Sequence, residues 1–142
     1  MKLDIWNAKL TKFRVSDGDT LKDCILDIGH FILKDQVDIR LTCSRGPINA
    51  PELKKLEKAA GIKVRDWLKA RLSSATTDNL VWVKTRQINY QEVYGRVLAE
   101  LYIDDTEIGT EMLELGLVKF CSPEGTRVPF TQAELDFIVN SF

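Results

Sequence analysis

Residues 12–41 have the sequence KFRVSDGDTLKDCILDIGHFILKDQVDIRL, and this stretch decides the fold. Residues 12–16 alternate polar and apolar side chains, which is typical of a half-buried strand, and Asp17-Gly18-Asp19 is a turn sequence. The pattern predicts a second strand over residues 20–28 and a third over residues 31–41. Because short turns connect these three strands, we expect them to pair in an antiparallel arrangement.

The third predicted strand has two different faces. Val37, Ile39 and Leu41 share one face, because side chains alternate along a strand, whereas Asp38 and Arg40 point the other way. We therefore expect Arg40 to project away from the core near the end of the strand, where it can meet a ligand.

The long central helix follows a loop. Ser, Arg, Gly, Pro and Asn make residues 42–50 a loop, and Pro51-Glu52 suits the first turn of a helix. Apolar residues then recur at helical spacing at Leu53, Leu56, Ala60, Val64, Trp67, Leu68 and Leu72. Gly61 interrupts this pattern, and residues 73–79 are expected to form a polar linker.

The second half of the chain predicts two more strands and two more helices. In chain order these are a strand over residues 80–86, a loop over residues 87–95, a strand over residues 96–103, and helices over residues 107–115 and 131–140. Gly116 is the expected C-cap of the first of these helices. Thr131 and Glu134 form a capping-box pattern at the start of the second.

Five strands with about three helices favour a mainly β fold with helices. One long helix after the third strand matches a small closed barrel of the oligonucleotide-binding (OB) type better than a parallel sheet. The chain of 142 residues is expected to form a single domain over residues 1–142. Barrels of this type often bind polyanions on one face and in their loops.

The composition is that of an ordinary globular protein, with 44% hydrophobic residues, 29% charged residues and a net charge of −1. Residues 1–71 hold five more basic than acidic residues, and residues 72–142 hold six more acidic than basic ones. No apolar run resembles a signal peptide or a membrane span, and Cys24, Cys43 and Cys121 show no metal-binding spacing. We expect a cytoplasmic protein with reduced thiols and no membrane partner.

Three polar residues have the chemistry of a site for a hard metal ion. Asp19 follows a glycine turn, and Asn49 and Glu52 offer oxygen atoms from a second loop, which are ligands that calcium accepts. The alternative is that Asp17, Asp19 and Asn49 are turn residues that hydrogen-bond to the local backbone. From these residues alone, the turn interpretation is favoured.

Two arginines and one glutamate have the chemistry for phosphate hydrolysis. Arg40 and Arg96 can each bind a phosphate with two parallel hydrogen bonds, although any single arginine is more often a surface residue. Glu52 can orient or deprotonate a water molecule, or it can be a glutamate favoured by the helix dipole. His30, the single histidine, lies between strands next to a glycine, and a structural role is favoured for it.

Taken together, these pieces resemble the staphylococcal (thermonuclease-type) nuclease family over about residues 8–121. The matching pieces are Val15-Ser16-Asp17-Gly18-Asp19-Thr20, Ile39-Arg40-Leu41, Ile48-Asn49-Ala50-Pro51-Glu52, Tyr94-Gly95-Arg96-Val97-Leu98-Ala99 and Leu115-Gly116-Leu117-Val118. Each piece alone is weak, but their joint order along the chain is specific.

The resemblance implies an OB-fold barrel with three helices and calcium-dependent hydrolysis of DNA and RNA phosphodiester bonds. It assigns metal (Ca²⁺) binding to Asp19, Asn49 and the Ala50 carbonyl, catalysis to Arg40, Glu52 and Arg96, and substrate binding to Arg40, Tyr94 and Arg96. We therefore expect a monomeric, calcium-dependent nuclease whose partner is single-stranded or frayed DNA or RNA.

The chain also departs from the family pattern. Asn49 stands where the family usually has an aspartate, and the stretch from Arg40 to Asn49 is longer than usual. The family's nucleotide-holding tyrosines are replaced near Cys121-Ser122-Pro123, and Val93 stands where a lysine is expected. These departures keep an alternative open, namely a catalytically weak or inactive module that binds single-stranded nucleic acid or a protein partner.

Overall fold

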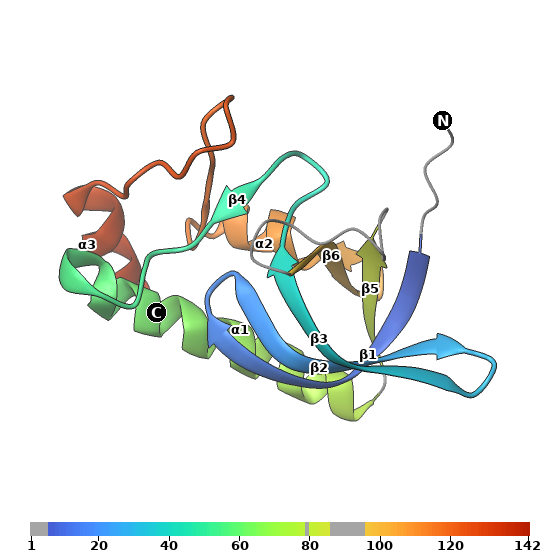
Figure 1. The fold of residues 1–142 in the computed structure, drawn as a ribbon. Coiled ribbons are helices and arrows are strands. Elements are labelled where there is room, and N and C mark those ends of the chain that lie inside the picture. The colour runs from blue at the N-terminus through green and yellow to red at the C-terminus, as the bar shows by residue number, and fades with distance from the viewer. Residues whose placement is uncertain (1–5, 79, 86–95) are drawn as a thin grey trace.

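The computed structural model describes residues 6–78, 80–85 and 96–142. Its first three strands, β1 (Trp6–Asp17), β2 (Thr20–Gly29) and β3 (Ile32–Leu41), pair in antiparallel order as the sequence predicts. β1 begins six residues earlier than the predicted strand. Figure 1 shows these strands as one continuous curved ribbon that forms the first part of a barrel.

Two further strands close the barrel. β5 (Val81–Thr85) pairs with β1, and β6 (Val97–Ile103) pairs with β5, both in antiparallel order. β6 also pairs with β3, but in parallel, so that Arg40 lies opposite Leu98. The five strands therefore form a closed barrel, which confirms the predicted fold.

Within the described residues, three α-helices and several short elements complete the fold. The long α1 (Lys58–Thr77) runs across the end of the barrel and along β1, and α3 (Gln132–Ser141) packs against α1 (Figure 1). α2 (Ile108–Glu114) follows the short strand β7 (Thr106–Glu107). A separate two-stranded sheet joins β4 (Ile48–Asn49) to β8 (Lys119–Phe120), and a short 3-10 helix, η1 (Lys55–Glu57), precedes α1.

The core fills the barrel and the space beneath α1. Leu10, Leu21, Ile39 and Leu101 come from the barrel strands, and Leu68 comes from α1; each is fully buried. Burial of one such side chain stabilises the fold by about 1.5–3 kcal/mol. The alternation along β3 leaves Arg40 partly exposed between buried Ile39 and Leu41, as predicted.

The start of the long helix differs from the prediction. Pro51 and Glu52 are not helical, and α1 begins only at Lys58. Lys54 is fully extended and Lys55 has a positive φ of 55°, so a helix cannot pass through them. A helix prediction that rests on residue spacing does not detect these two backbone conformations.

The end of α1 also differs from the prediction. The expected polar linker from residue 73 is the last part of the helix, which ends at Thr77. The hydroxyls of Ser73 and Thr76 each donate to the carbonyl four residues earlier, at 2.6 Å, so their polar groups are satisfied within the helix. Ala75 is buried against the core and keeps this segment in place.

The capping box is confirmed, whereas the C-cap of α2 is Leu115, one residue before the predicted Gly116. Gly116, at a φ of +78°, follows α2, and its N–H donates to the Leu113 carbonyl at 3.1 Å. The Thr131 hydroxyl accepts from the Glu134 N–H at 3.2 Å, and the Glu134 carboxylate accepts from the Thr131 N–H at 2.7 Å. This reciprocal pair is the predicted capping box.

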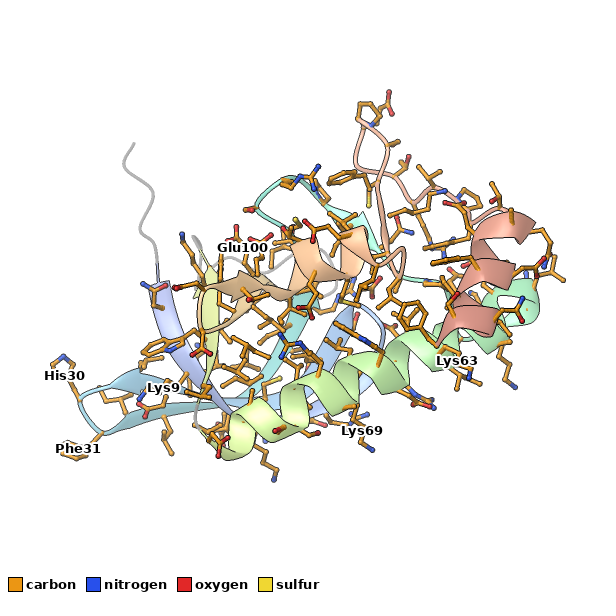
Figure 2. The ribbon with its side chains drawn as sticks, turned by 180° about the vertical axis from the view of Figure 1, so that it is seen from behind. Lys9, His30, Phe31, Lys63, Lys69 and Glu100 are labelled. Atoms are coloured by element: carbon orange, nitrogen blue, oxygen red, sulfur yellow. The ribbon has the colours of Figure 1, made fainter. Side chains whose placement is uncertain are left out.

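The β2–β3 hairpin extends beyond the barrel. Figure 2 shows His30 and Phe31 at its tip, pointing into solvent and away from the rest of the molecule. His30 is thus a turn residue. Within the described ranges, none of the helices combines the length and the apolar character needed to cross a membrane.

Candidate functional site

A cleft of about 700 Å³ lies where the β1–β2 turn, β3, β6 and the segments around residues 50 and 125 meet. Its charged lining residues are Asp17, Asp19, Arg40, Glu52, Arg96 and Arg127. Asn49 and Ala50 line it as well. The fold therefore gathers every described residue to which the sequence assigned a role, whereas Tyr94 lies outside the described residues.

The turn between β1 and β2 is pressed against its neighbours. The Asp17 carboxylate accepts a hydrogen bond from the Asp19 N–H at 3.1 Å, which is the turn interaction expected from the sequence. A Cβ atom on Gly18 would lie 2.5 Å from Val64 Cγ1 and 2.7 Å from Ala50 Cβ. Glycine is therefore required here, and the close contact fixes Asp19 at the wall of the cleft.

The Asp19 carboxylate is buried and held from three sides. Its Oδ2 lies 2.6 Å from Arg40 Nη1 and accepts from the Ala50 N–H at 2.8 Å, and its Oδ1 accepts from the Thr20 hydroxyl at 3.0 Å. Burial alone would raise the pKa of Asp19. The hydrogen bonds from Asp17, Ala50 and Thr20 and the charge of Arg40 outweigh burial and lower the pKa, so Asp19 is a carboxylate.

Both arginines are connected to Asp19. Arg40 Nη2 also donates to the Ile48 carbonyl at 2.9 Å, which orients the guanidinium along the cleft wall. Arg96 Nη1 donates to the Thr20 hydroxyl at 3.3 Å, and that hydroxyl in turn donates to Asp19. Thr20 belongs to the motif over residues 15–20, but the sequence analysis assigned it no role. Its position directly after Asp19 was the signal that could have revealed its contact with the carboxylate.

Asp17 is an unusual acid in this site. Burial raises the pKa of Asp17 from 3.8 to about 6, and the neighbouring Asp19 contributes in the same direction. The ionised form of Asp17 is therefore disfavoured beside a second carboxylate. A cation bound close to both groups would remove this penalty.

Asn49 is buried beside the cleft with incomplete hydrogen bonding. It is 1% exposed, and its Oδ1 accepts from the Cys121 thiol at 3.4 Å. Its Nδ2 has no hydrogen-bond partner among the described residues. A buried polar atom without a partner is uncommon, and this amide N–H₂ is a donor that can serve an acceptor such as a phosphate oxygen but not a cation.

Glu52 enters the cleft from a segment without regular secondary structure, which corrects the prediction that it lies in the first turn of a helix. Its carboxylate is 3.8 Å from Arg127 Nε and 3.9 Å from Lys54 Nζ. Arg127 also donates to the Ala50 carbonyl at 3.2 Å. Sequence reasoning missed Arg127, and no local pattern could reveal it, because the acceptors of its hydrogen bonds, Glu57 and Ala50, lie 70 and 77 positions away.

The cleft contains oxygen ligands suited to a hard cation, although within the described ranges no three His, Cys, Asp or Glu side chains come together to hold a metal ion. The Asp19 carboxylate and the Ala50 carbonyl also already accept from Arg40 and Arg127. Carboxylate, amide and backbone carbonyl oxygens are the ligands that calcium prefers. The cleft supplies the Asp17 and Asp19 carboxylates, the Asn49 amide and the Ala50 carbonyl. The three acids and three arginines that line it cancel in formal charge, so a divalent cation would make the site attractive to a phosphodiester.

Comparison with known proteins adds no family: no protein-family model matches this chain, and no curated protein matches it either.

Proposed function

We propose that this protein is a calcium-dependent nuclease that hydrolyses phosphodiester bonds of single-stranded or frayed DNA or RNA. The observation that supports the proposal is the convergence of Asp19, Arg40, Glu52 and Arg96 on one cleft. Within it, Asp19 contacts Arg40 directly and Arg96 through the Thr20 hydroxyl.

Asp19, Asn49 and the Ala50 carbonyl would hold the metal ion. Calcium bound there would act as a Lewis acid that polarises a phosphoryl oxygen. The Asp19 carboxylate supplies the negative charge of the binding site, and the neutral Asn49 amide adds a ligand without charge. The Asn49 side chain is already buried, so it would lose little further freedom when a ligand binds.

The two arginines would bind and stabilise the phosphate. Each guanidinium can donate two parallel hydrogen bonds to phosphate oxygens and keeps its charge at any physiological pH. Arg40 is oriented by Ile48 and Asp19, and Arg96 by Thr20, so both donors are in place before the substrate arrives. Donors placed in advance stabilise the extra charge that develops on a five-coordinate phosphorus.

Glu52 would orient the attacking water and accept its proton. The water oxygen forms the new bond to phosphorus, the bond to the leaving oxygen breaks, and the leaving oxygen takes a proton from solvent. The carboxylate of Glu52 is 41% exposed, so water can reach it directly. The cytoplasmic location and the monomeric state remain predictions beside this mechanism.

The test is cleavage of a fluorescently labelled single-stranded oligonucleotide with calcium and with a chelator. We expect Glu52→Gln and Arg96→Ala each to lower turnover by about 10²–10⁴-fold, because each removes one transition-state contribution. Glu114→Gln and Arg14→Ala are the matched controls, since both side chains are exposed and neither lines the cleft. Unchanged cleavage by both cleft variants would exclude the mechanism.

One observation favours a second function, a nucleic-acid-binding module without efficient catalysis. The Asp19 carboxylate is already paired with Arg40, and the second metal ligand would be the neutral Asn49, so both features would lower the affinity for calcium. In the same assay, salt-dependent binding of the oligonucleotide without cleavage would support this alternative. Absence of any salt-dependent binding would instead favour a protein partner.

A further inference from the structure

An ion pair outside the expected active-site residues connects two segments that lie far apart in the sequence. Arg127 hydrogen-bonds to the Glu57 carboxylate through two of its nitrogens, and its Nη2 also donates to the Ala50 carbonyl at 3.2 Å. Arg127 comes from the loop before α3, whereas Ala50 and Glu57 belong to the segment that contains Glu52. The pair therefore fixes that segment against the C-terminal part of the chain.

Glu57 is the centre of this connection. Besides Arg127, it accepts from the backbone N–H of Glu52 at 2.9 Å and from the N–H of Phe130 at 3.3 Å. Its side chain is 13% exposed. Burial alone would raise the pKa of Glu57, but the hydrogen bonds from Arg127, Glu52 and Phe130 outweigh it and lower the pKa. The carboxylate thus stays ionised and holds the backbone of Glu52 directly.

Glu52 depends on these anchors, because little else fixes its side chain. The carboxylate is 41% exposed, and its nearest cations, Arg127 Nε and Lys54 Nζ, lie at 3.8 and 3.9 Å, beyond hydrogen-bond distance. The main chain of Glu52 also contacts α1 so closely that a Cβ on Gly61 would lie 2.4 Å from the Glu52 carbonyl oxygen. The main chain of Glu52 is therefore held between Gly61 and Glu57.

We propose that Arg127 and Glu57 form a positioning unit that sets the place of Glu52 in the cleft. This inference rests on the proposed function, in which Glu52 orients the attacking water. Neither residue takes part in bond making; both act through the backbone and carboxylate of Glu52. A displacement of about 1 Å at such a group costs about 10²-fold in rate.

The experiment compares kcat and KM for wild type, Arg127→Ala, Arg127→Lys and Glu57→Gln on a single-stranded oligonucleotide with calcium. We expect kcat to fall by about 10- to 100-fold in Arg127→Ala and Glu57→Gln while KM changes by less than about 3-fold, with partial recovery in Arg127→Lys. A raised KM with unchanged kcat would overturn the proposal, because it would make Arg127 a substrate-binding residue.

A double variant tests whether Arg127 acts through Glu52. In a Glu52→Ala background, Arg127→Ala should lower the residual kcat by less than about 2-fold, because the group that it positions is gone. The same 10- to 100-fold loss in both backgrounds would contradict the proposal. Arg71→Ala is the matched control, because Arg71 forms a comparable bidentate pair with Glu111 away from the cleft. The kcat of this variant should equal that of wild type.

A measurement without turnover separates this inference from the proposed function. Amide hydrogen exchange should accelerate by at least about 10-fold at Glu52 and Phe130 in Glu57→Gln, with core amides such as that of Leu68 unchanged. Unchanged exchange at Glu52 overturns the anchoring even if the enzyme is active. A wild-type protein that does not cleave overturns the proposed function and, with it, the catalytic part of this inference.

Discussion

Glu107 allows a quantitative prediction about the loop over residues 42–47. Its carboxylate accepts from the Cys43 thiol at 3.0 Å, the Ser44 hydroxyl at 3.0 Å, the Tyr102 hydroxyl at 2.9 Å and the Thr110 hydroxyl. Burial alone would raise the pKa of Glu107, but these hydrogen bonds outweigh it and lower the pKa from 4.5 to about 2. One side chain of β7 therefore anchors the start of the loop.

The lowered pKa of Glu107 determines how much the ionised carboxylate stabilises the folded protein and at which pH this stabilisation is lost. Because the folded state favours the ionised form, Glu107 stabilises the protein fully above pH 4.5 and loses this contribution as the pH falls towards 2. The upper limit is about 3.5 kcal/mol, at about 1.4 kcal/mol for each pH unit between the two pKa values. Glu107 keeps part of its surface in water, and solvent screening reduces the expected contribution to about 1–2 kcal/mol.

The substitution Glu107→Gln keeps the shape of the side chain but replaces one acceptor oxygen with an amide NH₂. This NH₂ group would then face the hydrogen-bond donors that surround the wild-type carboxylate. The assay is urea unfolding of the calcium-free protein at pH 7.5, 5.0 and 3.0. We expect the free energy of unfolding to fall by about 1–2 kcal/mol at pH 7.5 and 5.0, with less than about half of this difference left at pH 3.0.

The control for this prediction is Glu114→Gln, which removes the same charge from an exposed residue at the end of α2. Its free energy of unfolding should stay within about 0.5 kcal/mol of wild type at all three pH values. A Glu107→Gln difference that is equal at pH 7.5 and 3.0, or below about 0.5 kcal/mol at pH 7.5, would refute the reasoning.

Two further predictions concern the walls of the cleft. Gly61→Ala should lower the free energy of unfolding by about 1–3 kcal/mol and reduce nuclease turnover, because the new Cβ atom would clash with the Glu52 carbonyl oxygen. Thermal unfolding measures the change in stability, and oligonucleotide cleavage measures the change in turnover. A stabilised and fully active variant would contradict this prediction. Asp17→Asn should stabilise the calcium-free protein by up to about 3 kcal/mol at pH 7.5. Burial raises the pKa of Asp17 to about 6. Ionisation of Asp17 therefore destabilises the folded wild-type protein increasingly as the pH rises from about 4 to 6, and the asparagine variant avoids this loss. Urea unfolding in chelator at pH 4.0 and 7.5 should show the gain at pH 7.5 alone, and an equal change at both pH values would exclude this cause.

Several features of the fold are readable from short stretches of sequence. The turn at residues 17–19, the three leading strands and the capping box at Thr131 depend on residues within a few positions of one another. Strand alternation also placed Arg40 on the side away from the core. Such features are predictable because each local hydrogen bond or side-chain direction is set by adjacent residues.

The start of α1 shows where local patterns stop being sufficient. The spacing of Leu53 and Leu56 favoured a helix, yet Leu56 is 85% exposed and the helix begins at Lys58. The Glu52 N–H donates to Glu57, and Arg127 holds that carboxylate from the far end of the chain. A tertiary contact therefore competes with the helical arrangement and prevails over it.

Sequence patterns were sufficient to predict the barrel class, the capping box and most of the charged cleft residues, but not Arg127. Only the tertiary structure decided that β3 and β6 pair in parallel, that Thr20 links Arg96 to Asp19, and that Arg127 reaches Ala50. The physical reason is the range of the interactions. Local hydrogen bonds are encoded by neighbouring residues. The cleft is assembled by closure of the barrel, which joins Thr20 to Arg96, 76 positions away, and by packing of the loop before α3, which brings Arg127 to Ala50, 77 positions away.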